Sequence, residues 1–230
     1  MSVLFQKEID RLKRQILSLS AEVEDDVRAA VRAVEERDPA IAQAVIDREV
    51  QTNAMEVDVE EECLKILALH QPVAADLRYI IAVHMISHDL ERIGDLSVHI
   101  AERALALCEQ PRIETPFRLG DMADRAQAML KKVLDAFVNL NPAAAREVRT
   151  ADREVDEINR EIFLQIKEAI KRDSSLFDPL LQIMHIARHL ERIADHATNI
   201  AEDLIYLVEG RIVRHKPEAA GSASGPSGRT

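Results

Sequence analysis

The chain has 230 residues and a formal net charge of -11, from 30 Lys and Arg against 41 Asp and Glu. This balance excludes the basic footprint of nucleic-acid-binding domains, and 6 Gly with 8 Pro are too few turn residues for an all-β fold. No apolar run approaches the roughly 18 residues of a membrane span, and the charged N-terminus lacks the apolar region of a signal peptide. We therefore expect a cytoplasmic protein with only indirect membrane contact.

Apolar residues recur at helical spacing along nearly the whole chain, which predicts six long helices. Asp38-Pro39 and Asn141-Pro142 read as an N-cap followed by Pro at the first helical position. Pro72 separates two further helices because it lacks a backbone donor and restricts the residue before it, and Asp178-Pro179 is expected to cap the last helix. The predicted helices span about residues 3–36, 39–69, 73–108, 117–139, 142–172 and 179–210.

The chain contains an internal repeat. Residues 91–95 (ERIGD) recur as residues 191–195 (ERIAD), and residues 47–50 (DREV) recur as residues 152–155, at offsets of 100 and 105 residues. Each half thus carries three helices in the same order, and short connections make neighbouring helices antiparallel. The sequence predicts an elongated all-α fold of two tandem, pseudo-repeated antiparallel three-helix bundles, residues 1–110 and 111–210, followed by a disordered basic and Gly/Ser-rich tail, residues 211–230.

Carboxylates at four-residue spacing flank the apolar faces of the second, third, fifth and sixth predicted helices. Residues four apart lie one above the other on a helix, so facing pairs from adjacent helices would bring several oxygens together. Like charges make such a cluster unfavourable without a cation, and oxygen-rich clusters suit Mg, Ca or Mn. The predicted metal ligands are Asp47, Glu91, Asp95, Asp152, Asp156, Glu191 and Asp195, with the neutral Gln51 in the eighth position.

Other interpretations of these residues stay open. Charged residues at helical spacing most often form a solvated face. His84, His88 and His99 lie along the first-half stripe as second-rank ligands, and imidazole would favour iron or zinc. Cys63 and Cys108 form no C-x-x-C motif and read as small buried apolar groups.

Familiar catalytic motifs are absent from the sequence. It contains no G-x-x-x-x-G-K-[ST] loop, no G-x-G-x-x-G fingerprint and no G-x-S-x-G elbow. We therefore predict that the protein is not an enzyme.

The motifs resemble those of the PhoU family. The resemblance rests on residues 71–78 (QPVAADLR) and 90–95 (LERIGD) in the first half, and on residues 190–197 (LERIADHA) and 199–202 (NIAE) in the second. It covers about Phe5 to Val208. It implies a cytoplasmic negative regulator of bacterial phosphate uptake and phosphate-starvation signalling. As an adaptor, it would link the phosphate ABC transporter, through its PstB-like ATPase, to a PhoR-like sensor histidine kinase.

The resemblance also implies metal binding, since some family members carry multinuclear iron or zinc clusters on E(D)-x-x-x-D motifs. Carried over to this sequence, the motifs fall on the seven acids named above. Gln51 replaces an expected acid and His99 replaces the usual Asn, so the first-half site departs from the pattern. We expect a homodimer. The alternative function is a metal-storing or metal-buffering helical protein without a signalling role.

Overall fold

The structure is a computed structural model that describes residues 3–113 and 117–213, and it is built from α-helices. Among these residues there is no β-strand, which confirms the predicted all-α class. The elements are α1 (Val3–Glu36), α2 (Pro39–His70), α3 (Ala74–Cys108), α4 (Leu119–Val138), α5 (Pro142–Arg172), a short 3-10 helix η1 (Ser174–Leu176) and α6 (Phe177–Glu209).

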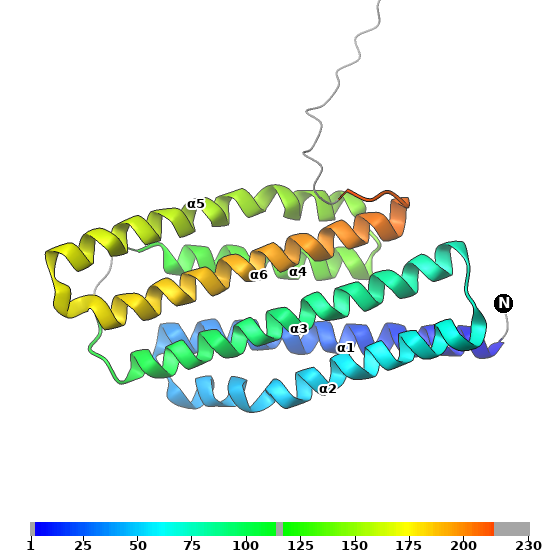
Figure 1. Ribbon diagram of the computed structural model, residues 1–230, viewed down its shortest axis with the longest axis horizontal. Helices are drawn as coiled ribbons and strands as arrows, with labels where there is room; N and C mark the ends of the chain where they lie inside the picture. The colour runs from blue at the N-terminus through cyan, green and yellow to red at the C-terminus, as the bar shows by residue number, and fades with distance from the viewer. Residues whose placement is uncertain (1–2, 114–116, 214–230) are drawn as a thin grey trace, which may run out of the picture.

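The six helices lie along one long axis and form an elongated molecule (Figure 1). Helices α1, α2 and α3 pack on one another, as do α4, α5 and α6, so the predicted pair of three-helix bundles is confirmed. The two halves meet mainly through α3 and α6, which run antiparallel side by side, and also through α1 and α4. The buried apolar side chains form one continuous cluster across both halves. The halves are therefore packed into a single body rather than separated by a linker.

The loops before α2 and α5 have the same construction. Asp38 accepts hydrogen bonds from the backbone N–H groups of the second and third helical residues at 2.8 and 3.3 Å. Asn141 does the same at 3.1 and 3.2 Å, and a Pro follows each cap. The residues before the caps, Arg37 and Leu140, both have a left-handed backbone, with φ of 54° and 48°. These equivalent loops lie 103 residues apart.

The same offset of 103 residues relates the buried faces of α2 and α5. Four buried positions of α2 match four buried positions of α5 at this spacing: Ala42, Val45, Val59 and Cys63 correspond to Ala145, Val148, Ile162 and Ile166. The offset of 105 inferred from the repeated DREV motif is therefore wrong by two residues. Because a helix turns about 100° per residue, that error rotates every inferred side chain by about 200°. Helices α3 and α6 keep the predicted offset of 100, since Leu90, Ile93 and Ile100 match Leu190, Ile193 and Ile200 as buried residues.

The predicted cap of α6 is also wrong. Asp178 lies in the first turn of α6 instead of preceding it. The cap belongs to η1, where the carboxylate of Asp173 accepts a hydrogen bond from the Ser175 backbone N–H at 2.9 Å. This 3-10 turn feeds directly into α6, so a helix start at Pro179 is displaced by two residues.

Two further expectations fall at the edges of the described chain. Of the expected tail, Arg211–Val213 continue beyond α6 without helical structure, and residues 214–230 lie outside the described residues. Residues 114–116 of the loop between the halves also lie outside them. No helix in the described part of the chain is both long and apolar enough to cross a membrane.

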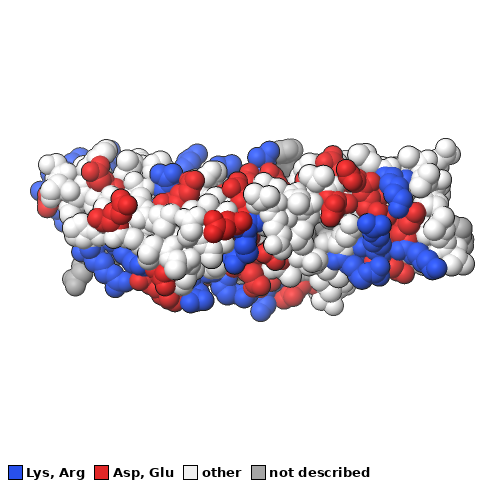
Figure 2. All heavy atoms as spheres, turned by 90° about the horizontal axis from the view of Figure 1, so that it is seen from below, with Lys and Arg blue, Asp and Glu red and all other residues white. Residues whose placement is uncertain are grey.

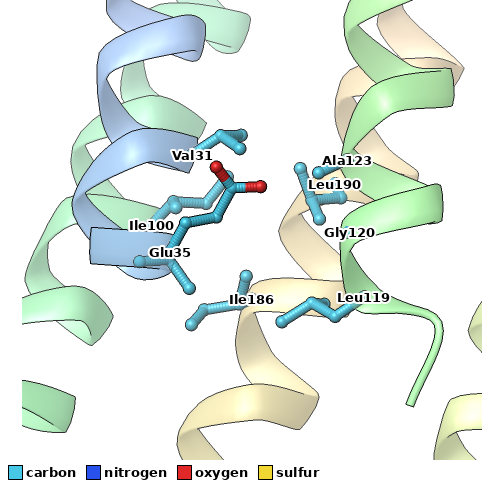
Figure 3. Close-up of a pocket in the computed structure, with 9 residues that line it drawn as sticks. Val31, Glu35, Ile100, Leu119, Gly120, Ala123, Ile186 and Leu190 are labelled. Atoms are coloured by element: carbon cyan, nitrogen blue, oxygen red, sulfur yellow. The ribbon is translucent and has the colours of Figure 1, made fainter. Parts of the chain in front are cut away.

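A small pocket lies where α1, α3, α4 and α6 meet (Figure 3). Its volume is about 40 Å³, and apolar side chains such as Ile100, Ile186 and Leu190 line it, with the carboxylate of Glu35 beside them. A space of this size is close to that of one water molecule. It is a packing gap between the halves and not a substrate site.

Candidate metal centre

Four predicted ligands come together in the second half. Asp152 lies on α5 with Asp156 one turn further on, and Glu191 and Asp195 lie on the neighbouring α6. Burial and, after it, the negative charges of the other three carboxylates together raise the pKa of Asp152 to about 6. The four acids therefore share one electrostatic environment, as the sequence predicts.

Positive charge offsets these four carboxylates only in part: Arg188 and Arg192 lower the pKa values of Glu191 and Asp195, but burial and the neighbouring carboxylates outweigh them. Arg160 reaches Asp156 at 3.7 Å from a largely exposed position, and such exposed pairs contribute little. Among the described residues, no Lys or Arg forms an ion pair with Asp152, Glu191 or Asp195. Loss of hydration raises the pKa of Glu191 and, at the exposed edge of the cluster, that of Asp195, and neighbouring carboxylates add to both shifts. A divalent cation would relieve this repulsion directly.

The spacing of the four carboxylates decides what kind of centre they fit. Within the described chain, no three of them place oxygens within 4.8 Å of one another. A single dehydrated Ca²⁺ needs several oxygens at about 2.3–2.6 Å, so these side chains are too widely spread for that. Two or more ions about 3.5–4 Å apart, or one ion that keeps some of its waters, would fill the wider gap. The donor set thus fits a multinuclear or hydrated cation.

The first half holds a weaker version of this cluster on α3. Burial raises the pKa of Glu91, and Asp95 and Glu56 add to the effect. Arg92 lies 3.4 Å from Glu91 and 3.5 Å from Asp95 and so offsets part of their charge. Arg192 is the second-half counterpart of Arg92 and lowers the pKa values of Glu191 and Asp195 without a recorded ion pair to them among the described residues.

The corrected register changes the α2 side of the first-half site. Asp47 is exposed, and its carboxylate accepts a hydrogen bond from Gln43 of the same helix at 2.8 Å. At the offset of 103 residues, the positions equivalent to Asp152 and Asp156 are Glu49 and Asn53, both half-buried. The expectation that Asp47 faces the α3 acids is therefore wrong, because DREV is a local coincidence. The matching cap-plus-proline pairs were the sequence signal that fixes the true register.

His99 belongs to the contact between the halves. Its ring stacks on that of His189 with 5.3 Å between centroids. Nearby, His196 Nδ1 lies 2.8 Å from Asp89 Oδ1 and Asn199 donates to the same oxygen at 3.2 Å, again joining α6 to α3. Burial lowers the pKa of His189 to about 4, so this ring stays neutral at pH 7. The role of His99 as a first-half ligand gains no support from this position.

We expect Asp152→Asn to stabilise the metal-free protein at pH 7.5. In the native state burial and the neighbouring carboxylates raise the Asp152 pKa to about 6, well above its ordinary value, so the folded chain holds this proton more tightly than the unfolded chain. The stability that this proton provides is present below pH 4 and is lost as the pH rises to about 6. Allowing for solvent screening, the variant should gain about 1–2 kcal/mol above pH 6 and nothing near pH 4.

Urea unfolding in chelator, at pH 4 and pH 7.5, measures this gain. Asp47→Asn is the matched control on an exposed helix face and should show no such pH-dependent difference. A loss of stability in Asp152→Asn at pH 7.5 would contradict the repulsive cluster.

Comparison with protein families and with curated proteins finds close sequence relatives of this chain. The PhoU domain profile matches twice, at residues 16–104 and 119–204. The phosphate-specific transport system accessory protein PhoU homolog of Pseudomonas aeruginosa is 38% identical over 212 residues, 92% of this chain and 88% of that protein. The PhoU protein of Escherichia coli K12 is 31% identical over 92% of this chain and 88% of its own length.

Solved structures give the same result. The crystal structure of PhoU from Pseudomonas aeruginosa superimposes with a TM-score of 0.87 and 37% identity, covering 90% of this chain and 100% of that one. The phosphate transport system regulatory protein PhoU from Streptococcus pneumoniae gives a TM-score of 0.81 at 30% identity, covering 91% and 99%. The chain therefore belongs to the PhoU family.

Proposed function

We propose that this protein is an accessory protein of phosphate transport that represses phosphate uptake and phosphate-starvation signalling. It acts in the cytoplasm as an adaptor between the transporter ATPase and a sensor histidine kinase. The observation that carries the proposal is the near full-length match to relatives named phosphate-specific transport system accessory proteins, at 31–38% identity. Both halves of the family repeat are present, so the chain has the parts that such relatives have.

The second-half carboxylates supply the proposed metal site. Asp152 and Asp156 would hold a cation from α5, and Glu191 and Asp195 would hold it from α6. The proposed metal is either a multinuclear iron or zinc cluster or an Mg or Mn ion. Its positive charge would offset the repulsion that raises the pKa values of Asp152, Glu191 and Asp195. By linking α5 to α6, it would fix the surface that the second half presents to partners.

The proposed action is by protein contact and not by catalysis. The sequence contains none of the catalytic motifs named above, such as the nucleophile elbow G-x-S-x-G. The net charge of -11 also disfavours capture of a free phosphate anion. Acidic and basic side chains are interspersed over the face shown in Figure 2, as on an ordinary solvated surface. The proposal includes a homodimer, and exposed apolar residues on α5, Phe163 and Leu164, support association of some kind.

Alkaline phosphatase expression in phosphate-rich medium tests this function. A strain lacking the gene should express the enzyme at a high level despite ample phosphate, and the intact gene should restore repression. A metal-buffering protein is the second candidate, favoured by the mutual repulsion of the carboxylates of α5 and α6. In that case deletion would alter metal tolerance and leave alkaline phosphatase repressed, which would contradict the regulatory role.

A further inference from the structure

A second group of metal donors lies on the same pair of helices as the first-half acids, and it begins within one helical turn of Glu91. Glu60 on α2 and His84 and His88 on α3 place one donor atom each within 4.8 Å of one another. Among the described residues this is the one set of three His, Cys, Asp or Glu side chains that converge so closely. His84 and His88 lie seven residues before Glu91 and Asp95, about 10.5 Å along the helix.

The surroundings of these side chains point to a ligand. The Nδ1 atom of His84 is buried and has no hydrogen-bond partner among the described residues. Its ring meets that of His88 edge to face, with 4.8 Å between centroids. Within the described chain, no Lys or Arg forms an ion pair with Glu60, unlike Glu62, which pairs with Arg11 and Lys65. The buried ring nitrogen of His84 and the carboxylate of Glu60 can therefore both donate electron pairs to a metal, and no Lys or Arg of the described chain pairs with that carboxylate.

A fourth polar residue lies beside one of the rings. Glu56 is buried, and its Oε1 lies 3.2 Å from Nδ1 of His88 without a hydrogen bond between them. This oxygen, like Nδ1 of His84, has no hydrogen-bond partner among the described residues. A carboxylate beside a metal-binding histidine is a common outer partner around zinc.

The second half provides an internal comparison. At the offsets fixed by the fold, Glu56, Glu60, His84 and His88 correspond to Asn159, Phe163, Met184 and Arg188. Those four residues line one groove of about 460 Å³ between α5 and α6, which confirms that the four positions lie together. The backbone arrangement is thus repeated, whereas the metal donors occur only in the first half. The donor set is therefore not a by-product of the helix packing.

We propose that Glu60, His84 and His88 form a mononuclear site for Zn²⁺ or a similar imidazole-binding cation, with the carboxylate of Glu56 as an outer partner beside His88. Zinc binds such mixed nitrogen and oxygen donors tetrahedrally at about 2.0–2.2 Å, which puts ligand atoms about 3.3 Å apart. The three donors need to close by at most about 1.5 Å from their present separation, within reach of small side-chain rotations. Three protein ligands leave a fourth position for water or a partner's side chain. This site is independent of the proposed function and of the second-half acidic cluster, and it adjoins the first-half acids, since His88 lies three residues before Glu91.

X-ray absorption at the zinc edge tests the proposal directly. The sample is the full chain without a His tag, with one equivalent of Zn²⁺. It carries Asp156→Ala and Asp195→Ala, which weaken the competing acidic cluster of the second half. We expect scattering from two imidazoles together with oxygen. A first shell of oxygen alone would overturn the site.

Zinc titration of variants in the same background gives a second readout. Glu60→Gln and His88→Gln should each weaken binding by more than the roughly 10- to 100-fold expected for the outer partner variant Glu56→Gln. His185→Gln is the matched control, because that half-buried His lies in the equivalent groove of the second half. Unchanged zinc affinity in Glu60→Gln and His88→Gln would overturn the proposal.

Discussion

Asp195→Ala is expected to lower the Mn²⁺ affinity of the protein more than Asp95→Ala does. Asp195 belongs to a cluster of four carboxylates whose mutual repulsion raises the pKa values of Asp152, Glu191 and Asp195. Asp95 instead shares Arg92 with Glu91, and its α2 partners at the corrected register are Glu49 and the neutral Asn53. A neutral amide adds no charge to offset a hard cation, so the second-half site should bind Mn²⁺ more tightly.

The measurement is Mn²⁺ titration of chelator-treated protein for each variant. We expect a drop of at least about 10- to 100-fold for the tight site in Asp195→Ala, the range found when even an outer partner of a metal ligand is removed. Asp124→Ala, at an exposed position on α4, is the control and should bind like the wild type. If Asp95→Ala loses more Mn²⁺ than Asp195→Ala, the ranking is wrong. If neither changes, the carboxylates are solvated helix faces.

Glu49→Ala is expected to weaken the first-half site, whereas Asp47→Ala leaves it unchanged. Positions two residues apart on a helix are separated by about 200° around its axis, so the side chains of Asp47 and Glu49 lie on different faces of α2. Glu49 occupies the position equivalent to Asp152, and Asp47 is exposed with Gln43 as its partner. Both variants remove one carboxylate from the same turn, which makes each the control for the other.

This comparison is best made in the Asp156→Ala/Asp195→Ala chain, where the weaker first-half site is measured alone. We expect Glu49→Ala to reduce Mn²⁺ affinity about tenfold or more. Equal losses from Glu49→Ala and Asp47→Ala would mean that bulk charge, and not a site, attracts the ion. A larger loss from Asp47→Ala would restore the register of the DREV motif.

Most of the fold was predictable because local signals agree with one another. Helical periodicity and the two cap-plus-proline pairs at Asp38 and Asn141 locate α2 and α5, and the structure places both caps as expected. The start of α6 was not predictable from Asp178-Pro179 alone. Asp173 directly follows the last residue of α5 and forms a competing cap, and the backbone then follows a 3-10 turn that sequence rules describe poorly.

The second-half site was predictable because its four acids lie on faces fixed by strong apolar stripes. The prediction for Asp47 in the first half was wrong, because the four-residue DREV identity was given more weight than the pattern of buried residues along α2. Glu60 was missed because it sits within a run of acids, residues 58 and 60–62, where sequence alone does not single out one carboxylate. Only the packing of α2 on α3 brings Glu60 to His84 and His88.

Replacement of the chromosomal gene by the Asp152→Asn/Asp156→Asn variant tests most directly whether the acidic centre serves phosphate regulation. The amide side chains keep the shape of α5 and remove two of the four charges that would hold a cation. With protein levels matched to wild type by immunoblot, we predict high alkaline phosphatase activity in phosphate-rich medium, close to that of the deletion strain. Full repression by this variant, at normal protein level, would contradict the account.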